Sequence, residues 1–306
     1  MAEIVVSEFM DEAVARDGFK DYDLLFDPEL VDRPDDLLAA VADARALIVR
    51  NRTQVRGALL DAAGKLAVVG RLGVGLDNID MDACKARDIT VAPARGANDL
   101  SVAEYVITAA MVLLRGAWGA SDAVAAGGWP RQALIGREIA GKTLGLVGYG
   151  AIARETAARA RALGMHVVAY DPYLPAGDAK WAGADPVDFD ALLAAADVVS
   201  LHVPLTDETR NLIDAGAVAR MRARAILINA ARGGIVDEAA LADALRDKRL
   251  GGAALDVFAA EPLTAEAGAK FDGLANVVLT PHIAGVTEES NARVSAVTVE
   301  NVLAAL

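Results

Sequence analysis

The chain has 306 residues, of which 54% are hydrophobic and 24% charged, and its formal net charge is −13. This length and apolar content predict a soluble globular protein with two domains, each with its own core. The acidic balance argues against general nucleic-acid binding, which needs a basic face. The single cysteine, Cys84, excludes an internal disulfide, so we expect a reducing cytoplasm in which Cys84 serves as a small buried hydrophobe.

No stretch of the sequence predicts export or a membrane span. The N-terminus, MAEIVVSEFMDE, has neither the basic start nor the long apolar run of a signal peptide. The most apolar window, residues 105–114, is far shorter than the ~20 residues that a spanning helix requires. We therefore expect a cytoplasmic protein with no membrane partner.

The first hundred residues alternate short apolar runs with stretches of helical character. The pattern predicts strands at 4–6, 46–49, 66–69 and 89–92, and helices at 35–44 and 55–63. Such an alternation is typical of a parallel sheet covered by helices. We expect these residues to form a first small α/β unit.

A longer helix is predicted next. Ser101 and Glu104 have the spacing of a capping box, and apolar residues follow at helical spacing. The pattern predicts one helix over 101–125 that ends at Gly127 and Gly128. Such a helix can carry the chain from the first unit into a second.

The second unit begins with a glycine-rich motif between two predicted strands. An apolar run at 143–147 predicts a buried strand, and Gly148, Gly150 and Ala153 follow in the pattern G-x-G-x-x-A. Gly148 permits a tight turn, Gly150 lets a pyrophosphate approach the backbone, and Ala153 lets the following helix pack closely. That helix should run to about residue 162. A second strand at 166–170 should end at Asp171.

Asp171 indicates which dinucleotide the motif binds. It follows Gly148 by 23 residues, close to the ~20-residue spacing at which an acidic side chain meets the adenine ribose. The carboxylate would accept hydrogen bonds from the ribose hydroxyls and repel a 2′-phosphate, and neither Pro172 nor Tyr173 beside it is basic. The sequence therefore predicts NAD rather than NADP. The predicted cofactor-binding residues around the motif are Gly148, Tyr149, Gly150, Ala151, Ile152 and Asp171.

The alternation resumes after Asp171. Strands are predicted at 198–201, 226–229, 252–257 and 277–279, and Asp237 is expected to cap a helix over 238–245. Residues 294–306 are apolar at helical spacing with no further strand to follow. We expect this last helix to fold back onto the first unit.

Three polar residues follow strands of the second unit: Arg232, Glu261 and His282. Ligands bind at the carboxyl ends of strands in open parallel sheets. Together these side chains suit the oxidation of a 2-hydroxy acid: Arg232 would hold the carboxylate, His282 would take the hydroxyl proton, and Glu261 would fix the imidazole. Taken singly, each residue has a structural alternative. Arg232 could form a surface ion pair, Glu261 could start a helix before Pro262, and His282 could be a loop histidine. No metal site is predicted.

The motifs in combination resemble a known family. GYGAIA with Asp171, HVPLT at 202–206, NAARGGIVDE, ALDVFAAEP and TPHIAG occur in the order and spacing of the D-isomer-specific 2-hydroxyacid dehydrogenases. The phosphoglycerate dehydrogenase branch is most similar, and GRLGVGLDNID and NDLSVAEYV resemble two more of its blocks. EIVVSEFMDEA and HIAGVTEESNARV also resemble bacterial sulfolactate dehydrogenases.

The resemblance implies an α/β fold of two Rossmann-like domains with parallel sheets. An NAD-binding domain, residues 100–283, would be inserted into a flavodoxin-like substrate-binding domain, residues 1–99 and 284–306. The region around helix 101–125 would help to form a homodimer. The chain ends at Leu306, so we expect no C-terminal regulatory domain of the kind found in many phosphoglycerate dehydrogenases.

The resemblance also implies roles for individual residues. Arg232, Glu261 and His282 match the catalytic residues, and Glu261 speaks against the formate dehydrogenase branch, which has Gln there. The other implied positions are Asp256 near the nicotinamide carboxamide, Val74 and Gly75 in the loop that holds the substrate carboxylate, and His202, Pro204 and Ala230 along the cofactor. A packed, purely structural imidazole is an equal alternative for His202.

The identity of the acid is left open. VRNRTQV places Arg50 and Arg52 after a predicted strand of the first unit, where the similar run of phosphoglycerate dehydrogenases helps to bind the phosphate. Either arginine could instead face solvent. We expect an NAD-dependent dehydrogenase of a small anionic 2-hydroxy acid with a second anion, of the 3-phosphoglycerate or 3-sulfolactate type. The alternatives are a glyoxylate or hydroxypyruvate reductase that uses NADPH, and a non-catalytic NAD-sensing module similar to transcriptional corepressors.

Overall fold

The computed structural model of the protein describes residues 2–306. The chain divides into two compact units: unit 1 extends to Asn98 and resumes at Val286, and unit 2 is Asp99–Gly285. The boundaries predicted from the sequence lie within two residues of these.

Unit 1 is built on a five-stranded sheet in which all neighbouring strands are parallel. The spatial order 2-1-3-4-5 is that of flavodoxin-like folds. In this order the strands are β2 (Leu24–Phe26), β1 (Ile4–Val6), β3 (Ala46–Val49), β4 (Val68–Arg71) and β5 (Thr90–Pro93).

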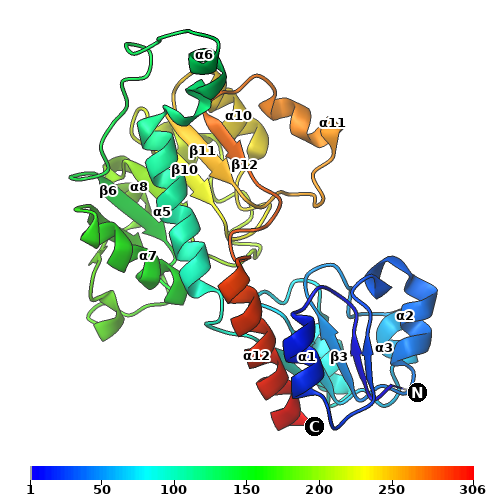
Figure 1. Cartoon of the computed structure of the whole chain (residues 1–306). Helices are drawn as coiled ribbons and strands as arrows, with labels where there is room; N and C mark the ends of the chain where they lie inside the picture. Colours follow the sequence, from blue (N-terminus) through cyan, green and yellow to red (C-terminus); the bar gives the residue numbers. More distant parts are fainter. Residues whose placement is uncertain (1) are drawn as a thin grey trace. The chain divides into compact units, whose positions relative to one another are not determined.

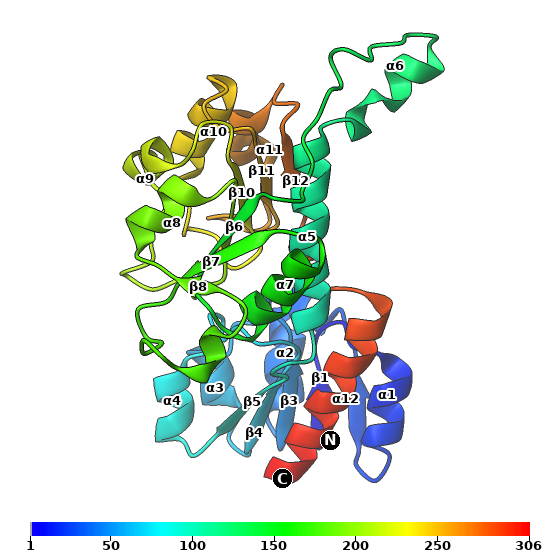
Figure 2. The same cartoon turned by 90° about the vertical axis from the view of Figure 1, so that its left-hand side faces the viewer.

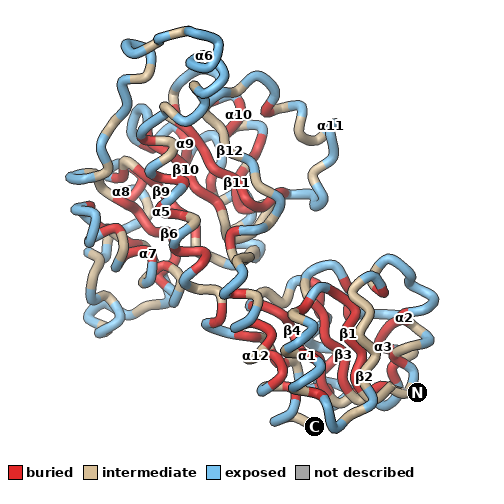
Figure 3. The backbone as a smooth tube through the Cα atoms, in the orientation of Figure 1, coloured by how far each residue is buried: buried red, intermediate tan, exposed pale blue. Residues whose placement is uncertain are grey.

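Successive residues of a strand point to opposite faces of the sheet, and every residue of β1, β3 and β4 is buried. Both faces of this sheet are therefore covered by helices. Ile4 and Val6 belong to a core shared with α1 (Glu12–Gly18) and α12 (Glu288–Ala305), whereas Val5 belongs to the opposite core. Figure 1 shows α1 and α12 side by side, and Figure 3 shows the buried strands between the two layers. The other helical elements are η1 (Leu30–Asp32), α2 (Pro34–Val41), α3 (Ala58–Ala62) and α4 (Met81–Ala86).

The C-terminal helix belongs to unit 1, as the sequence predicts. Ser295 on α12 accepts a hydrogen bond from the backbone N–H of Asp11 (3.0 Å). The helix begins at Glu288, earlier than the predicted start at 294, because Thr287 and Ser290 form a capping box there. Cys84 is buried in this unit as predicted, and burial raises the pKa of its thiol.

Unit 2 contains a seven-stranded parallel sheet. Renumbered from its first strand, the order is 3-2-1-4-5-6-7, the Rossmann order with one strand added. The predicted fold class is confirmed. From one edge to the other the strands are β8 (Asp185–Pro186), β7 (His166–Tyr170), β6 (Thr143–Val147), β9 (Val198–Leu201), β10 (Ile226–Asn229), β11 (Gly252–Leu255) and β12 (Val277–Leu279).

Two buried cores lie on the two faces of this sheet. Helices α5 (Asp99–Arg115) and α7 (Ala151–Ala162) pack on one face, and α8 (Phe189–Ala195), α9 (Ala215–Arg220) and α10 (Glu238–Arg246) pack on the other. Asp237 caps α10 as predicted and accepts from two backbone N–H groups. The remaining short elements are η2 (Trp118–Ala120), α6 (Ser121–Ala125), η3 (Ala179–Trp181), α11 (Ala265–Gly268) and η4 (Ala269–Phe271).

The prediction of one helix over 101–125 is wrong. Helix α5 begins at Asp99, so the expected capping box lies inside it, and it ends at Arg115 because Gly116 adopts a left-handed conformation (φ 64°). The chain then bends by 62° into η2 and α6. Figure 2 shows α6 and the loop after it projecting from the rest of unit 2.

Other differences are small or concern edge strands. The predicted strand 252–257 ends at Leu255, and those at 66–69 and 89–92 are shifted by one or two residues. Strands β2 and β8 have no counterpart in the prediction.

In residues 2–306 no single helix is long and apolar enough to cross a membrane, and only the bent pair of α5 with Trp118–Ala125 meets that test, by length and composition.

Candidate active site

The glycine-rich turn joins β6 to α7. Gly148 has a φ of 87°, and a Cβ there would lie 2.6 Å from the carbonyl oxygen of His202, so no other residue fits without a shift. Gly150 caps α7 without a side-chain hydrogen bond, and the space over its Cα is open. The first N–H groups of α7, those of Ala151 and Ile152 among them, are therefore presented as a helix N-terminus presents them to a phosphate. This arrangement fits the pyrophosphate of a dinucleotide.

Asp171 follows β7 and lies beside the turn. Its carboxylate accepts hydrogen bonds from the backbone N–H of Tyr149 (2.9 Å) and of Tyr173 (3.0 Å), one on each oxygen. Each oxygen keeps a second lone pair, so the carboxylate can still receive two ribose hydroxyls. The Tyr149 ring is buried and stacks on Trp181, with ring centroids 5.2 Å apart, which holds the turn in place. The residues fit the adenosine part of NAD.

Three more predicted cofactor residues follow strands at the same sheet edge. His202 follows β9, and its Nε2 lies 3.0 Å from the hydroxyl of Ser200. Burial lowers the pKa of His202 to about 4, so its imidazole is neutral at pH 7. Pro204 is two residues further along, and Ala230 comes directly after β10.

His282 and Glu261 are brought together from two different strand ends. His282 Nδ1 lies 2.7 Å from Glu261 Oε2, and the second oxygen of Glu261 accepts from the backbone N–H of Phe258 (3.0 Å). Burial would raise the pKa of Glu261, but the hydrogen bonds from His282 and Phe258 and the charge of Arg232 outweigh it and lower the pKa. An ionised carboxylate only accepts, so the hydrogen bond assigns the Nδ1 proton to His282 and leaves Nε2 for a substrate.

Arg232 lies close enough to this pair for its charge to act on Glu261. Its position depends on the turn after β10, where the Asn229 side chain donates to the Arg232 carbonyl (2.9 Å) and accepts from the Ala231 N–H (3.1 Å). One guanidinium nitrogen donates to the Ala231 carbonyl (2.5 Å). Within unit 2, an arginine, a carboxylate and an imidazole therefore meet at the carboxyl edge of the sheet. The set can bind an anion and exchange one proton.

The backbone of His282 is held in an unusual conformation. Its φ is 56°, in the left-handed region that non-glycine residues rarely adopt. Buried Asp256 secures the segment: one carboxylate oxygen accepts from the Thr280 hydroxyl (2.6 Å) and the Ile283 N–H (2.8 Å), and the other accepts from the Ala284 N–H (2.7 Å). Strained residues of this kind persist where the surroundings over-determine them, and they cluster at functional sites.

Asp256 makes hydrogen bonds that the sequence did not reveal. The carboxylate is committed to the loop that carries His282, and Tyr105 adds to the same network through the Thr280 hydroxyl (2.6 Å). An acidic residue directly after a buried strand was the available signal. Its partners, however, are backbone groups of another loop, which spacing alone does not identify.

In unit 1, the predicted substrate residues follow β3 and β4. Val74 is exposed, and Gly75 is next to it in the loop after β4. Buried Arg71, which the sequence reasoning did not select, ends β4 and donates to the Leu72 carbonyl (2.5 Å). The loop thus begins next to a buried cation and contains an exposed residue, Val74.

The structure distinguishes between Arg50 and Arg52. Arg50 donates to the Phe9 carbonyl (3.3 Å) and to the Asn291 side chain (3.2 Å), and its guanidinium lies over the Phe9 ring. Burial lowers the pKa of Arg50, with the charge of Glu8 opposing, but an arginine remains charged at neutral pH. Arg52 instead forms a two-point ion pair with Asp32 at the surface.

In residues 2–306 no three His, Cys, Asp or Glu side chains gather as a metal site would require.

Glu8, which accepts from the backbone of the loop that carries both arginines, is a further residue that sequence reasoning missed. It comes two residues after the end of β1, so its place near a strand end was a usable signal.

Comparisons with known proteins show which proteins the chain is similar to in sequence and in fold. Residues 107–284 match the family described as D-isomer specific 2-hydroxyacid dehydrogenase, NAD binding domain. The chain is 55% identical over 307 aligned residues to an (S)-sulfolactate dehydrogenase of Chromohalobacter salexigens, covering 100% of this chain and 99% of that protein. It is 45% identical to a D-3-phosphoglycerate dehydrogenase of Mycobacterium leprae, over 90% of this chain but only 52% of that longer protein.

A solved structure extends the likeness to the whole fold. The D-lactate dehydrogenase of Aquifex aeolicus, complexed with NAD and lactic acid, superposes with a TM-score of 0.85 at 29% identity, over 98% of this chain and 94% of that one. The glycine-rich turn, Asp171 and the Arg–Glu–His cluster are thus found in a chain whose full length matches such enzymes. The chain belongs to the D-isomer-specific 2-hydroxyacid dehydrogenases, and it is an NAD-dependent oxidoreductase of 2-hydroxy acids.

Proposed function

We propose that the substrate is a small 2-hydroxy acid with a second anionic group, and that (S)-sulfolactate is that acid. The observation that carries the proposal is Arg50, a second cation at a strand end, whose hydrogen-bond partners Phe9 and Asn291 are neutral. The similarity to an (S)-sulfolactate dehydrogenase over the full length supports it. In this scheme unit 2 binds NAD and supplies the proton-transfer residues, and residues of unit 1 contribute to substrate binding.

The stereochemistry of the two candidate acids is compatible with one site. In sulfolactate the carbon that bears sulfur outranks the carboxyl group, whereas in 3-phosphoglycerate the carboxyl group outranks the phosphate-bearing carbon. The (S) label of sulfolactate and the D label of 3-phosphoglycerate therefore describe the same spatial arrangement at C2. A site built for one acid presents the hydroxyl correctly for the other, and the second anion decides between them.

We assign the chemistry to residues of unit 2. The cofactor would supply the hydride acceptor for C2 of the acid as NAD, and the hydride donor for the reverse reaction as NADH. His282 takes the hydroxyl proton at Nε2, and Glu261 stabilises the imidazolium through Nδ1. Arg232 binds the carboxylate and polarises the C2 oxygen through its planar donors.

We assign further binding roles along both sheets. The N–H groups of Val74 and Gly75 would hold the substrate carboxylate in unit 1. His202, Pro204 and Ala230 would line the cofactor in unit 2. Asp256 would act as a positioning residue for the His282 loop and border the nicotinamide end.

Replacement of Glu261 by Gln should move the pH profile. The amide can still accept the Nδ1 proton, but it removes the charge that stabilises the imidazolium, so we expect the acid limb of the oxidation rate to move to lower pH. The maximal rate should fall much less than on loss of His282. Steady-state rates across pH measure this, and Glu266→Gln, an exposed residue on α11, is the matched control. An unmoved acid limb would contradict the assignment.

Replacement of Asp171 should weaken cofactor discrimination. We expect the wild-type protein to bind NAD at least about tenfold more tightly than NADP, because a 2′-phosphate would meet this carboxylate. Asp171→Ala should weaken NAD binding and narrow the ratio. Calorimetric titration of both cofactors measures it, with Asp185→Ala, on the exposed strand β8, as control. Equal wild-type affinities for the two cofactors would refute the role of Asp171.

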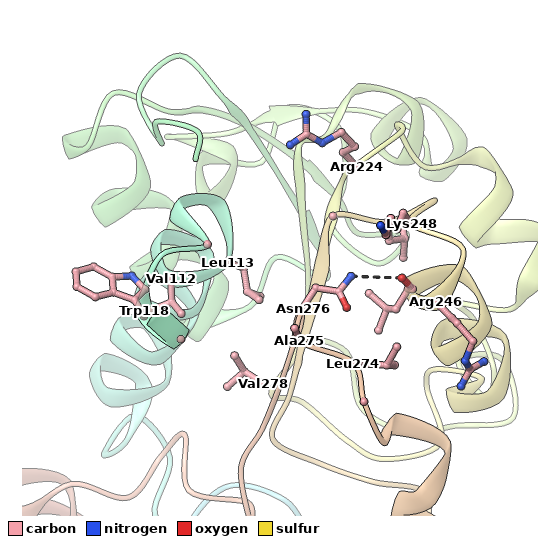
Figure 4. Close-up of a pocket in the computed structure, with 16 residues that line it drawn as sticks. Val112, Leu113, Trp118, Arg224, Arg246, Lys248, Leu274, Ala275, Asn276 and Val278 are labelled. Atoms are coloured by element: carbon pink, nitrogen blue, oxygen red, sulfur yellow. Dashed lines mark hydrogen bonds between the residues drawn. The ribbon is translucent and has the colours of Figure 1, made fainter. Parts of the chain in front are cut away.

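We further propose a cytoplasmic homodimer formed through the region that follows α5. Large apolar side chains are concentrated there: Trp118, Trp129 and Ile135 are 67%, 76% and 73% exposed. Trp118 also lines a pocket of about 940 Å³ at the amino ends of β11 and β12, where apolar side chains such as Leu113 and Val278 lie with the basic residues Arg224, Arg246 and Lys248 (Figure 4). Exposed apolar surface of this kind marks interaction sites. Light scattering of the purified protein tests the proposal.

A substrate screen that follows NADH absorbance tests the function. (S)-Sulfolactate should give the highest kcat/KM, with 3-phosphoglycerate next and D-lactate and glycerate far lower. Preference for hydroxypyruvate or glyoxylate with NADPH would favour the reductase alternative. NADH binding without turnover of any acid would favour a sensing module.

A further inference from the structure

The loop that carries Arg50 and Arg52 is fixed by one buried carboxylate. Glu8 is 4% exposed, and its oxygens accept from four consecutive backbone N–H groups: those of Arg50 (2.9 Å), Asn51 (3.3 Å), Arg52 (3.0 Å) and Thr53 (2.9 Å). Glu8 follows β1 and the loop follows β3, which is paired with β1. Both arginines therefore start from a defined backbone at the carboxyl edge of the unit 1 sheet.

The two arginines differ in the charge of the groups that their side chains contact. Arg50 meets a carbonyl, an amide oxygen and an aromatic ring, so its own positive charge is not cancelled by a hydrogen-bonded anion. Arg52 meets the carboxylate of Asp32 at two points, one of them 3.2 Å, and both side chains are 56% exposed. The Arg52–Asp32 pair therefore has no net charge.

This difference bears on which second anion the loop accepts. A sulfonate carries one negative charge, whereas a phosphate monoester carries nearly two at pH 7, because its second pKa is about 6. Glu8 contributes the same charge with either substrate. The pairing of Arg52 therefore determines whether the loop offers one cation or two to an approaching anion.

We propose that Asp32 is a specificity-determining residue: by pairing with Arg52 it leaves Arg50 as the cation offered by loop 50–53, so a sulfonate is favoured over a phosphate. This inference rests on the proposed function, since it supposes that the loop meets the second anion. Asp32 touches neither substrate nor cofactor in this scheme. It acts by cancelling the charge of a neighbouring arginine.

The test is to measure kcat/KM for (S)-sulfolactate and for D-3-phosphoglycerate with the wild-type protein and with Asp32→Asn. The variant keeps the shape of the side chain and releases Arg52. The ratio of the two constants should shift toward 3-phosphoglycerate by about three- to tenfold, because one extra unit of positive charge acts on one extra unit of negative charge at short range in water. The shift should shrink at high salt, where exposed charges are screened.

Two further variants separate this effect from a structural one. Asp61→Asn breaks another exposed Asp–Arg pair of unit 1, with Arg87, and should leave the ratio unchanged. The double variant Asp32→Asn/Arg52→Ala should restore the wild-type ratio, because the released cation is gone. An unchanged ratio in Asp32→Asn, or a shift that persists in the double variant, would overturn the inference.

The wild-type rates distinguish failure of the inference from failure of the proposed function. If the wild-type protein turns over D-lactate as well as either charged acid, the loop does not bind a second anion, and both proposals are wrong. If it prefers (S)-sulfolactate but Asp32→Asn leaves the ratio unchanged, only the role of Asp32 is wrong. A wild-type preference for (S)-sulfolactate, together with the expected shift of the ratio in Asp32→Asn, supports both the proposed function and the role of Asp32.

Discussion

Replacement of His282 by Ala should lower kcat by about 10²–10⁴, the usual contribution of a positioned acid–base group, while NADH still binds. The reason is geometric. The imidazole is fixed through Nδ1 by Glu261 at 2.7 Å, and its segment is held by buried Asp256, so Nε2 presents one defined proton acceptor. Without it, the hydroxyl proton must leave to water, whereas the glycine-rich turn and Asp171 are untouched.

Steady-state rates and NADH fluorescence titration measure the two effects separately. His166→Ala is the matched control, because His166 is an exposed residue at the start of β7. It should leave both rate and binding unchanged. A variant at His282 that retains the wild-type rate, or that loses NADH binding, would remove the residue from the proton-transfer role.

The parts of the fold that the sequence predicts best are those with local causes. Strands β6 and β7 and helix α7 have the predicted bounds, since the glycines of the turn and the apolar runs beside it determine them within one short segment. The break after α5 depends on the backbone conformation of Gly116, which apolar periodicity does not encode. Strand β2 is half-buried at a sheet edge, and its three apolar residues, Leu-Leu-Phe between two aspartates, lack the β-branched side chains that mark the predicted strands.

In the candidate site, too, the sequence predicts some features and not others. Arg232, Glu261 and His282 could be selected from the sequence because each follows a strand of one parallel sheet, whose carboxyl ends lie on one edge. Their mutual distances could not be predicted, since loop conformations set them. Glu8 and Asp32 were missed, and the contacts of Asp256 with the His282 loop were not predicted, because the partners of these residues are backbone groups or side chains of other loops.

Replacement of Arg50 by Ala should reduce kcat/KM by roughly ten- to a hundredfold for substrates with a second anion, and only slightly for D-lactate or glycerate. A charge-assisted hydrogen bond contributes about 1.5–3 kcal/mol, and this loss corresponds to one such bond. The protein carries a net charge of −13, so its general field does not attract an anion, and a fixed cation must supply the attraction.

Arg52→Ala is the matched control for Arg50→Ala, because the guanidinium of Arg52 is engaged by Asp32. Its effect on every substrate should be small, as expected for an exposed ion pair. Arg50→Lys should recover only part of the loss, since an ammonium group cannot donate to the Phe9 carbonyl and the Asn291 side chain with the fixed fork of a guanidinium. If Arg50→Ala lowers the rate equally with charged and uncharged acids, Arg50 supports the fold of unit 1 through those contacts, and the second anion is bound elsewhere.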